Sequence, residues 1–499
     1  MSGFPKVNYK GALSEDKSAV DNTDCVVTNK YSWRTGIALQ KYIDDNLKDI
    51  SKERDFVRNL VRYCRYDSFS RGKVYSLSGL RSTGKSIGMC QCIRRLNNYG
   101  RCVYIQFVRG KDVEFDELLE ILISLPSSIK YIFIDEISVV RDFVHCSGVL
   151  ADNFTLGGKK IVVAGRDSYA IECAFADGLF HRCILDNVTL ISYQEHVRTI
   201  GGNLEDYLSS GGLYEVSSYR GVEGLKSYIN TSIVENISSS ISKNNISELK
   251  GISEEDIRSA TYMILYEIIY SNSKKLSFDI VINAGLSDKV NEDKLTLKRL
   301  IDLSLGLKLN ETIDKDKIQE VLHALERMGV IVKCDNICLN GQGKRYNYHV
   351  VIPYLVNNIY SLIIDVVTGA GENVSEKNFS QIQGLTLESV LVSHVTKYSG
   401  LNCYFYHNTK TNSEVDLVLL DMNIVDSNAY LVEVKLSSDP EIAYSKGHWV
   451  REISEEDFIM EDVIVVSRKI VYMGKTKNEL GLINCTKFLN SVKNLKSVL

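Results

Sequence analysis

Short runs of apolar residues alternate with amphipathic segments between residues 74 and 191. The runs are VYSLSG (74–79), RCVYIQF (101–107), KYIFIDE (130–136), KIVVAG (160–165) and CILDNVTLI (183–191). The segments between them, such as KSIGMCQCIRRLNN and FDELLEILISL, carry apolar residues at helical spacing. Strands and helices in regular alternation predict a parallel sheet covered by helices, which is an α/β fold.

The pattern changes on both sides of this region. Residues 1–30 are polar, which predicts a flexible N-terminal tail. Residues 35–66 have apolar positions at helical spacing and predict one or two helices before the first strand. Residues 203–250 are rich in Ser and Asn and predict a helical lid.

Residues 251–365 predict a helical region with a winged helix near its end. KDKIQEVLHALERMGVIVKCDNICLN has the pattern of a helix, a glycine stop and two strands. Residues 366–499 change again, with the helical segment LTLESVLVSHVTKY before the strand-like NCYFYHN, EVDLVLLD, YLVEVKLS and DVIVVSRK. The predicted division is therefore a tail (1–30), a parallel-sheet core (31–202), a lid (203–250), a winged-helix region (251–365) and a second α/β domain (366–499).

Composition narrows the class of protein. The 499 residues are 44% hydrophobic and 24% charged, with a net charge of −4. This balance argues against a protein that coats nucleic acid with its whole surface, but leaves a local basic patch open. The 12 cysteines show no zinc-finger spacing, which predicts free thiols in the cytoplasm. No apolar run approaches the roughly 20 residues that span a membrane.

GLRSTGKS (79–86) matches the phosphate-binding loop G-x4-G-K-[ST] at every fixed position. A strand before it and a helix after it favour this interpretation over a chance match in a turn. Backbone N–H groups and the helix N-terminus would face phosphate oxygens. The spacing predicts Lys85 at the β- and γ-phosphates and Ser86 on Mg²⁺. The expected nucleotide-binding residues are Gly79, Arg81, Ser82, Thr83, Gly84, Lys85, Ser86 and Ile87.

The run YIFID ends in Asp135, and Glu136 follows. A carboxylate at the end of a buried strand is where this fold holds Mg²⁺, so Asp135 is a predicted metal residue. An adjacent glutamate can orient and deprotonate the attacking water. Together with the loop, Glu136 predicts a hydrolysing ATPase.

Weaker signals follow the fourth and fifth runs. Arg166 and Ser168 are candidates for a residue near the γ-phosphate, although a solvent-facing loop fits equally well. Arg182 is a candidate arginine finger toward a neighbouring subunit, with an ordinary surface arginine as the alternative.

These motifs, with VTLISYQEHV and DYLSSGGLYE, resemble in order and spacing the bacterial and archaeal AAA-type ATPases that carry a C-terminal endonuclease-like domain of unknown function. The resemblance covers roughly residues 35–240 and 310–470. Arg81 fits a position that is often basic in that family, and Glu195 fits its acidic position after the fifth strand. Departures are Ser138 in place of Gln, Arg166 in place of Ser, and His181 in place of the glycine before Arg182. Relatives of this type often form rings, so an oligomer is an open expectation.

The C-terminal segment resembles the core pattern of PD-(D/E)xK nucleases. Asp416 lies on one predicted strand, and Glu433 and Lys435 lie on one face of the next. Asp416 and Glu433 could hold Mg²⁺ while Lys435 activates water, and Glu388 matches the helix glutamate of such sites. An ordinary amphipathic surface strand is the alternative, and a retained fold does not fix activity.

The winged-helix segment is ambiguous in charge. Its helix carries Lys317, His323 and Arg327 but also acidic residues, which favours packing over DNA reading. Lys344 and Arg345 downstream could contact a nucleic-acid backbone or belong to a packed wing.

The sequence thus predicts a Mg²⁺-dependent ATPase whose hydrolysis repositions a nuclease-like domain, with DNA as the expected target. The first alternative is a nucleotide-dependent switch that binds a protein partner and carries an inactive nuclease-like domain. In the second, the C-terminal domain is the effector and the ATPase its sensor.

Overall fold

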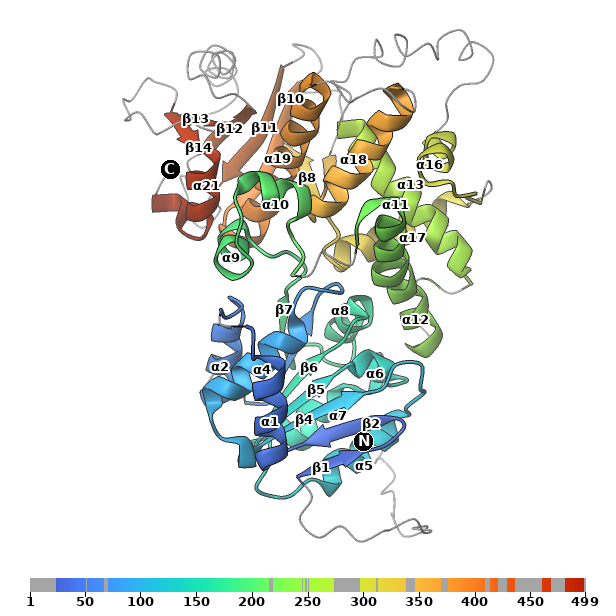
Figure 1. Cartoon of the computed structure of the whole chain (residues 1–499), viewed down its shortest axis with the longest axis vertical. Helices are drawn as coiled ribbons and strands as arrows, with labels where there is room; N and C mark the ends of the chain where they lie inside the picture. Colours follow the sequence, from blue (N-terminus) through green and yellow to red (C-terminus); the bar gives the residue numbers. More distant parts are fainter. Residues whose placement is uncertain are drawn as a thin grey trace, which may run out of the picture.

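The computed structural model describes residues 24–50, 52–66, 71–214, 219–244, 246, 249, 251–272, 297–310, 313–337, 346–368, 376–408, 413–420, 429–435, 460–467 and 481–497. These residues form two seven-stranded sheets, one in the lower half of Figure 1 and one in the upper half. Most of the predicted tail, residues 1–23, lies outside the described residues.

The first sheet contains all five predicted strands. Its order is β1-β2-β4-β5-β6-β3-β7, with bounds Cys25–Val27, Tyr31–Arg34, Cys102–Phe107, Tyr131–Asp135, Lys160–Ala164, Val74–Ser78 and Cys183–Asn187. The strands from β4 to β7 in this order are parallel, which confirms the predicted parallel sheet. The phosphate-binding loop follows the inner strand β3.

Both faces of this sheet are buried, which is why its strands are almost continuously apolar. Ile132 and Ile134 of β5 face one core while Phe133 faces the other. Helices α1 (Gly36–Asn46), α2 (Val57–Arg65) and α4 (Lys85–Leu96) cover the Phe133 side. The opposite side is covered by α5 (Phe115–Ser124), α6 (Phe143–Cys146), α7 (Gly148–Leu150), the π-helix η3 (Ala151–Thr155) and α8 (Ser168–Ala176).

An antiparallel hairpin extends the sheet where the sequence predicted the end of a tail. Strands β1 and β2 pair with each other, and β2 pairs antiparallel with β4. The boundary at residue 30 therefore differs from the structure, because residues 25–34 form one hairpin. Alternation in so short a strand as β1 is too brief to be read from the sequence.

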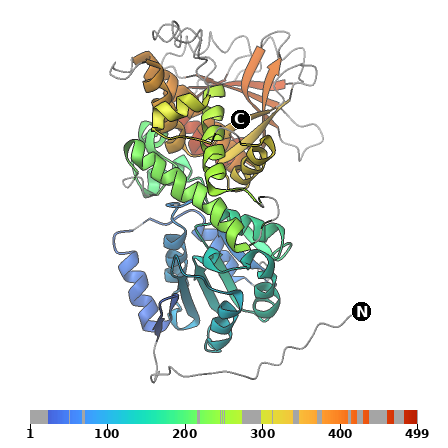
Figure 2. The same ribbon diagram turned by 90° about the vertical axis from the view of Figure 1, so that its right-hand side faces the viewer.

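Helices connect the two sheets. They are α9 (Tyr193–Thr199), α10 (Leu204–Ser210), α11 (Gly221–Ile229), α12 (Glu235–Asn244), α13 (Glu254–Asn272), α16 (Leu297–Leu305), α17 (Lys315–Arg327) and α18 (Pro353–Thr368). Helix α12 contacts α8 of the lower half. Figure 2 shows the green helices between the two halves. None of the described helices has the length and apolar character needed to cross a membrane.

The second sheet has the order β14-β13-β12-β11-β10-β8-β9. Its strands are Gly481–Asn484, Met460–Ser467, Ala429–Lys435, Ser413–Leu420, Asn402–Asn408, Ile331–Asn336 and Tyr346–Val350. Helices α19 (Glu376–Tyr398) and α21 (Cys485–Ser491) and the 3-10 helix η7 (Val492–Ser497) pack with it.

The predicted boundary between residues 365 and 366 does not separate two units. It falls inside α18, and the helix-strand-strand pattern of α17, β8 and β9 is joined to the second sheet through β8 and β10. Cys334 of β8 is buried in the same core as Phe405 of β10, and this shared apolar face explains the joined sheet. Lys344 and Arg345 lie outside the described residues.

Candidate functional site

Residues 79–84 form a tight loop between β3 and α4. Gly84 has φ +75°, and a Cβ atom there would lie 2.7 Å from Arg54 Nη1. A Cβ atom on Gly79 would lie 3.0 Å from Val188. Both positions therefore need glycine, for conformation or for space. Helix α4 begins directly after the loop at Lys85, so its N-terminal N–H groups point toward the loop.

Lys85 is 7% exposed and is held inside the curve of the loop. Its ammonium donates to the carbonyl oxygens of Gly79 at 2.5 Å and Leu80 at 2.8 Å. Burial lowers the pKa of Lys85 to about 8, although the nearby Glu136 and Asp135 oppose this shift. The site therefore holds a cation whose desolvation an anion would offset.

A cavity of about 320 Å³ brings the predicted residues together. It is lined by Arg81, Ser82, Thr83, Gly84, Lys85, Ser86, Ile87, Asp135, Glu136, Gly165, Arg166, Tyr214 and Tyr219. All the predicted loop residues except Gly79 line it, together with both carboxylates. Tyr214 and Tyr219 escaped prediction because they follow DYLSSGG, far from the loop in sequence. Ser168 is buried at the start of α8 and is not among the lining residues.

Asp135 is buried at the carboxyl end of β5. One of its oxygens accepts a hydrogen bond from the Tyr104 hydroxyl at 2.6 Å, and the other from the Glu136 N–H at 2.9 Å. These donors fix the carboxylate beside the loop. Tyr104 was not predicted; it lies on β4, where its alternation with Val103 and Ile105 looks like ordinary core packing.

Glu136 has φ +57°, a left-handed conformation that is costly for a residue with a side chain. Arg166 Nε donates to Glu136 Oε1 at 2.9 Å. The pKa of Arg166 is lowered by burial, which the Glu136 carboxylate opposes. Arg166 was one of two candidates for a residue near the γ-phosphate, and the structure places it on Glu136.

Ser86 and Asp135 both line the cavity and provide hard oxygen donors. This donor set fits Mg²⁺, which prefers carboxylate and hydroxyl oxygens beside phosphates.

Arg182 does not line this cavity. It precedes β7 and pairs with Asp152 at 2.9 Å, and both side chains are 48% exposed. Within one copy of the chain it is therefore a surface arginine.

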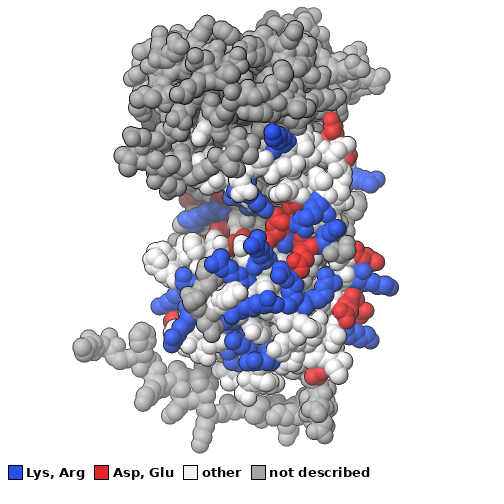
Figure 3. All heavy atoms as spheres, turned by 90° about the vertical axis from the view of Figure 1, so that its left-hand side faces the viewer, with Lys and Arg blue, Asp and Glu red and all other residues white. Residues whose placement is uncertain are grey.

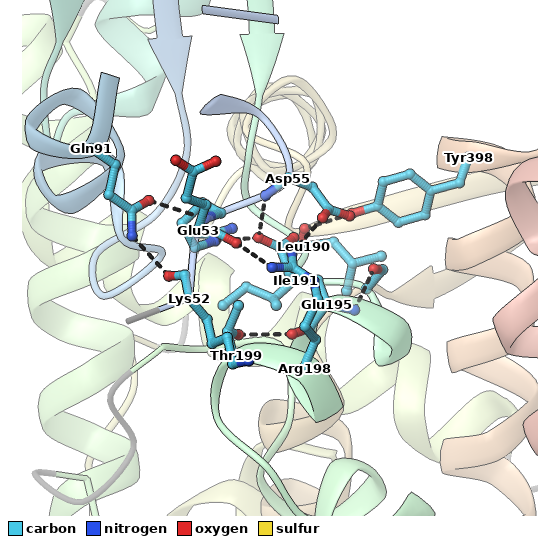
Figure 4. Close-up of polar contacts among 12 residues, drawn as sticks. Lys52, Glu53, Asp55, Gln91, Leu190, Ile191, Glu195, Arg198, Thr199 and Tyr398 are labelled. Carbon is cyan, nitrogen blue, oxygen red and sulfur yellow. Dashed lines mark hydrogen bonds and ion pairs between the residues drawn. The ribbon is translucent and has the colours of Figure 1, made fainter. Parts of the chain in front are cut away.

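A segment before α2 contacts α9, and Figure 4 shows its residues Lys52, Glu53 and Asp55 beside Glu195 and Arg198. Arg54 Nε donates to Glu195 Oε1 at 2.5 Å, and these side chains are 1% and 4% exposed. The Asp55 N–H also donates to Glu195, at 2.8 Å. Asp55 in turn pairs with Arg198 of α9 and with Lys493 of η7. Glu195, predicted as a family match, thus holds the segment behind Gly84.

In the second sheet, Asp416 and Glu433 are buried on adjacent strands. Leu417 pairs with Val432, so the register places Asp416 beside Glu433. The Val434 N–H donates to Asp416 at 2.8 Å. Glu388 lies on α19, and the side chain of Lys435 lies outside the described residues. Among the described residues, no three His, Cys, Asp or Glu side chains form a group that could hold a metal.

Residues 71–197 match a protein family described as an AAA domain. These residues form an AAA domain. The matched range contains the phosphate-binding loop and both carboxylates. It leaves the β1–β2 hairpin, α1 and α2 outside. A search of curated proteins finds no match to this chain.

Three solved structures are distantly similar to parts of this chain. Hsp104 of S. cerevisiae in a complex with casein is 13% identical, with a TM-score of 0.23, over 54% of this chain and 44% of that one. A DNA polymerase III gamma subunit-related protein of Thermotoga maritima is 8% identical, with a TM-score of 0.20, over 69% and 86% of the two chains. Cdc6p of Pyrobaculum aerophilum is 14% identical, with a TM-score of 0.18, over 66% and 93%. This chain thus spans less than half the length of Hsp104, and such low TM-scores say nothing about its domain arrangement.

Proposed function

We propose that the AAA domain binds ATP with Mg²⁺ and hydrolyses it. The observation that supports this most is the single cavity of about 320 Å³ lined by Lys85, Asp135 and Glu136 together with the loop. A buried ammonium, a buried carboxylate and a second carboxylate at the end of the same strand are the groups that phosphoryl transfer to water needs.

Each residue has a distinct task. Lys85 binds the β- and γ-phosphate oxygens, and the loop N–H groups orient them. Ser86 and Asp135 hold Mg²⁺, which when bound neutralises phosphate charge. Glu136 orients the attacking water and accepts its proton. Arg182 is proposed as an arginine finger toward a neighbouring copy.

The contact between Arg166 and Glu136 defines a resting state. Because Oε1 of Glu136 accepts from Arg166, the guanidinium competes with attacking water for that oxygen. Arg166 would leave Glu136 when a γ-phosphate offers it a stronger anionic partner. This contact also supports the alternative function, a slow nucleotide-dependent switch that binds a protein partner.

We further propose that hydrolysis repositions the second sheet and α19, as a PD-(D/E)xK-like domain acting on DNA. Arg54 lies against Gly84 of the loop and bonds Glu195, so movement of the loop reaches α9. Asp416 and Glu433, side by side on β11 and β12, would provide the metal-binding carboxylates of that domain, with Lys435 and Glu388 as their predicted companions.

The test compares ATP hydrolysis and DNA cleavage by the wild type, Lys85→Ala, Glu136→Gln and Asp416→Ala. We expect Lys85→Ala to lose ATP binding. Glu136→Gln should bind ATP but hydrolyse it at least about a hundredfold more slowly. Absence of ATP turnover by the wild type, with and without DNA, would refute the ATPase. If Asp416→Ala changes neither cleavage nor turnover while partner binding follows ATP occupancy, the switch is the better account.

A further inference from the structure

One face of the lower half is basic although the whole chain is acidic. Residues 52–101 contain twelve Lys or Arg, of which Arg54 and Lys85 are buried, but only three Asp or Glu, against a net charge of −4 for the full sequence. Figure 3 shows Lys and Arg side chains gathered on this face, which Figure 1 places over α1, α2 and α4. An uneven distribution of this kind attracts polyanions.

Helix α2 forms the ordered part of this face. Arg58, Arg62 and Arg65 follow the i, i+4, i+7 spacing of one helix face, and all three are exposed. At 1.5 Å per residue this row extends over about 10 Å. The opposite side of α2 is buried in the core through residues such as Leu60 and Val61, so packing fixes the direction of the row.

The helix dipole favours only some of the three arginines of α2. Arg62 and Arg65 lie in the last turn of α2, where cations are favourable. Arg58 lies in the first turn, where a cation opposes the helix dipole, and α2 has no acidic residue in that turn. The positive charge of α2 therefore continues through the end at which the helix dipole does not favour it.

An exposed aromatic ring and a second pair of arginines complete the surface. Tyr66 directly follows α2 and is 59% exposed. Arg94 and Arg95 lie in the last turn of α4, where Arg95 pairs with Glu53 at 3.3 Å. Arg65 Nη2 donates to the Arg95 carbonyl at 3.0 Å, so the two helix ends lie together. At the other end of the row, Arg58 lines a cavity of about 370 Å³ whose lining is mixed in charge and contains Lys493 as well as Asp55, Asp186 and Glu195.

We propose that α2, Tyr66 and the end of α4 form a binding surface for single-stranded nucleic acid. Guanidinium groups in a row fit a phosphodiester backbone, and an exposed tyrosine beside them provides a stacking platform for a base. An acidic protein or an anionic membrane would use the charges but would have no need of the tyrosine ring. The inference deepens the proposed function, because it names single-stranded nucleic acid as the partner of the ATPase. The binding itself does not depend on ATP hydrolysis; only its role in the cycle rests on the proposed function.

The test measures fluorescence anisotropy of labelled single-stranded DNA and RNA oligonucleotides, without ATP, over a range of salt concentrations. Arg58→Gln/Arg62→Gln/Arg65→Gln should weaken binding at least about tenfold. Loss of three contacts should also reduce the slope of log affinity against log salt by about 2. A matched control, Lys111→Gln/Lys308→Gln/Lys315→Gln, removes three exposed charges elsewhere and should leave affinity within about twofold.

Two further experiments distinguish binding of nucleic acid from binding of other polyanions and from misfolding. Tyr66→Ala should weaken single-stranded DNA or RNA binding about fivefold or more but leave heparin binding unchanged, because heparin has no bases to stack. Replacing the three arginines by lysine should retain most of the affinity, which shows that the glutamine variant failed through charge and not through misfolding.

Equal losses in the arginine variant and its control would overturn the proposal. So would binding to phosphatidylserine vesicles or an acidic protein without binding to oligonucleotides, or duplex binding that Tyr66→Ala does not distinguish from single-strand binding. ATP turnover is measured separately on the wild type. Oligonucleotide binding without turnover would refute only the ATPase, and turnover without oligonucleotide binding would refute only this inference.

Discussion

The buried ion pair behind the phosphate-binding loop provides a quantitative test of the structure. Glu195→Gln keeps the shape of the side chain and removes its charge. Arg54 then remains 1% exposed with no carboxylate opposite its Nε, and among the described residues its Nη1 already has no hydrogen-bond partner. Removing one member of a buried pair costs about 3 kcal/mol or more, because the remaining charge stays desolvated.

Hydrogen exchange is a suitable assay because a chain of this length does not unfold in one step. A local cost of about 3 kcal/mol should accelerate amide exchange in residues 52–60 and 193–199 roughly a hundredfold. Exchange in β5 should change little. Asp152→Asn, which breaks the half-exposed pair with Arg182, is the control and should cost less than about 1 kcal/mol.

Arg54→Met combined with Glu195→Gln removes both charges and should recover part of the protection lost in Glu195→Gln. If Glu195→Gln behaves like Asp152→Asn, the pair does not hold the segment against α9. The connection that we propose between the loop and the second sheet would then be wrong.

Three more predictions follow from single contacts. ATP affinity should fall as pH rises through about 8, because Lys85, whose pKa is lowered to about 8, loses its positive charge there. Calorimetric titration of ATP binding at several pH values tests this. The affinity of Lys85→Arg should not change over the same range. Tyr104→Phe removes the hydroxyl that donates to Asp135 at 2.6 Å, and should raise the Mg²⁺ concentration needed for ATP binding about tenfold. Burial raises the pKa of Asp55, but Lys493 and Arg198 outweigh it and leave this pKa below its usual value. The ion pair between Asp55 and Lys493 therefore contributes its full stability above the unfolded-state pKa of Asp55. This contribution is lost as pH falls through the folded-state pKa. The protection factors of residues 492–497, which compare exchange with its intrinsic rate at each pH, should fall on acidification in the wild type, and Lys493→Gln should reduce this pH dependence.

The loop and its two carboxylates could be predicted because their chemistry is local. Gly84 needs its left-handed conformation whatever surrounds it, and Asp135 ends a strand whose apolar run shows its burial. The partners of these residues could not be found in the same way. Tyr104 alternates with apolar neighbours like a core residue, and Arg166 follows a strand like any loop residue. Their roles depend on which strands lie side by side.

The predicted domain boundaries also show which features are local and which depend on long-range contacts. The helix-strand-strand pattern of residues 315–350 was predicted, but its strands belong to a larger sheet because β8 pairs with β10, about seventy residues later. The row of arginines on α2 is visible in the sequence only as a helix with one charged face. Whether that face meets solvent or another element depends on how α2 packs on α4.

By itself, the sequence determined the five strands from β3 to β7, the helices that alternate with them and the glycine-rich loop between β3 and α4, because these depend on spacing along the chain. The tertiary structure decided that Arg166 holds Glu136, that Glu195 anchors Arg54 behind the loop, and that β8 and β9 join the second sheet. Each of these contacts joins residues at least thirty positions apart or couples separate elements. Sequence spacing does not specify such contacts; the packing of apolar faces and the pairing of buried charges do.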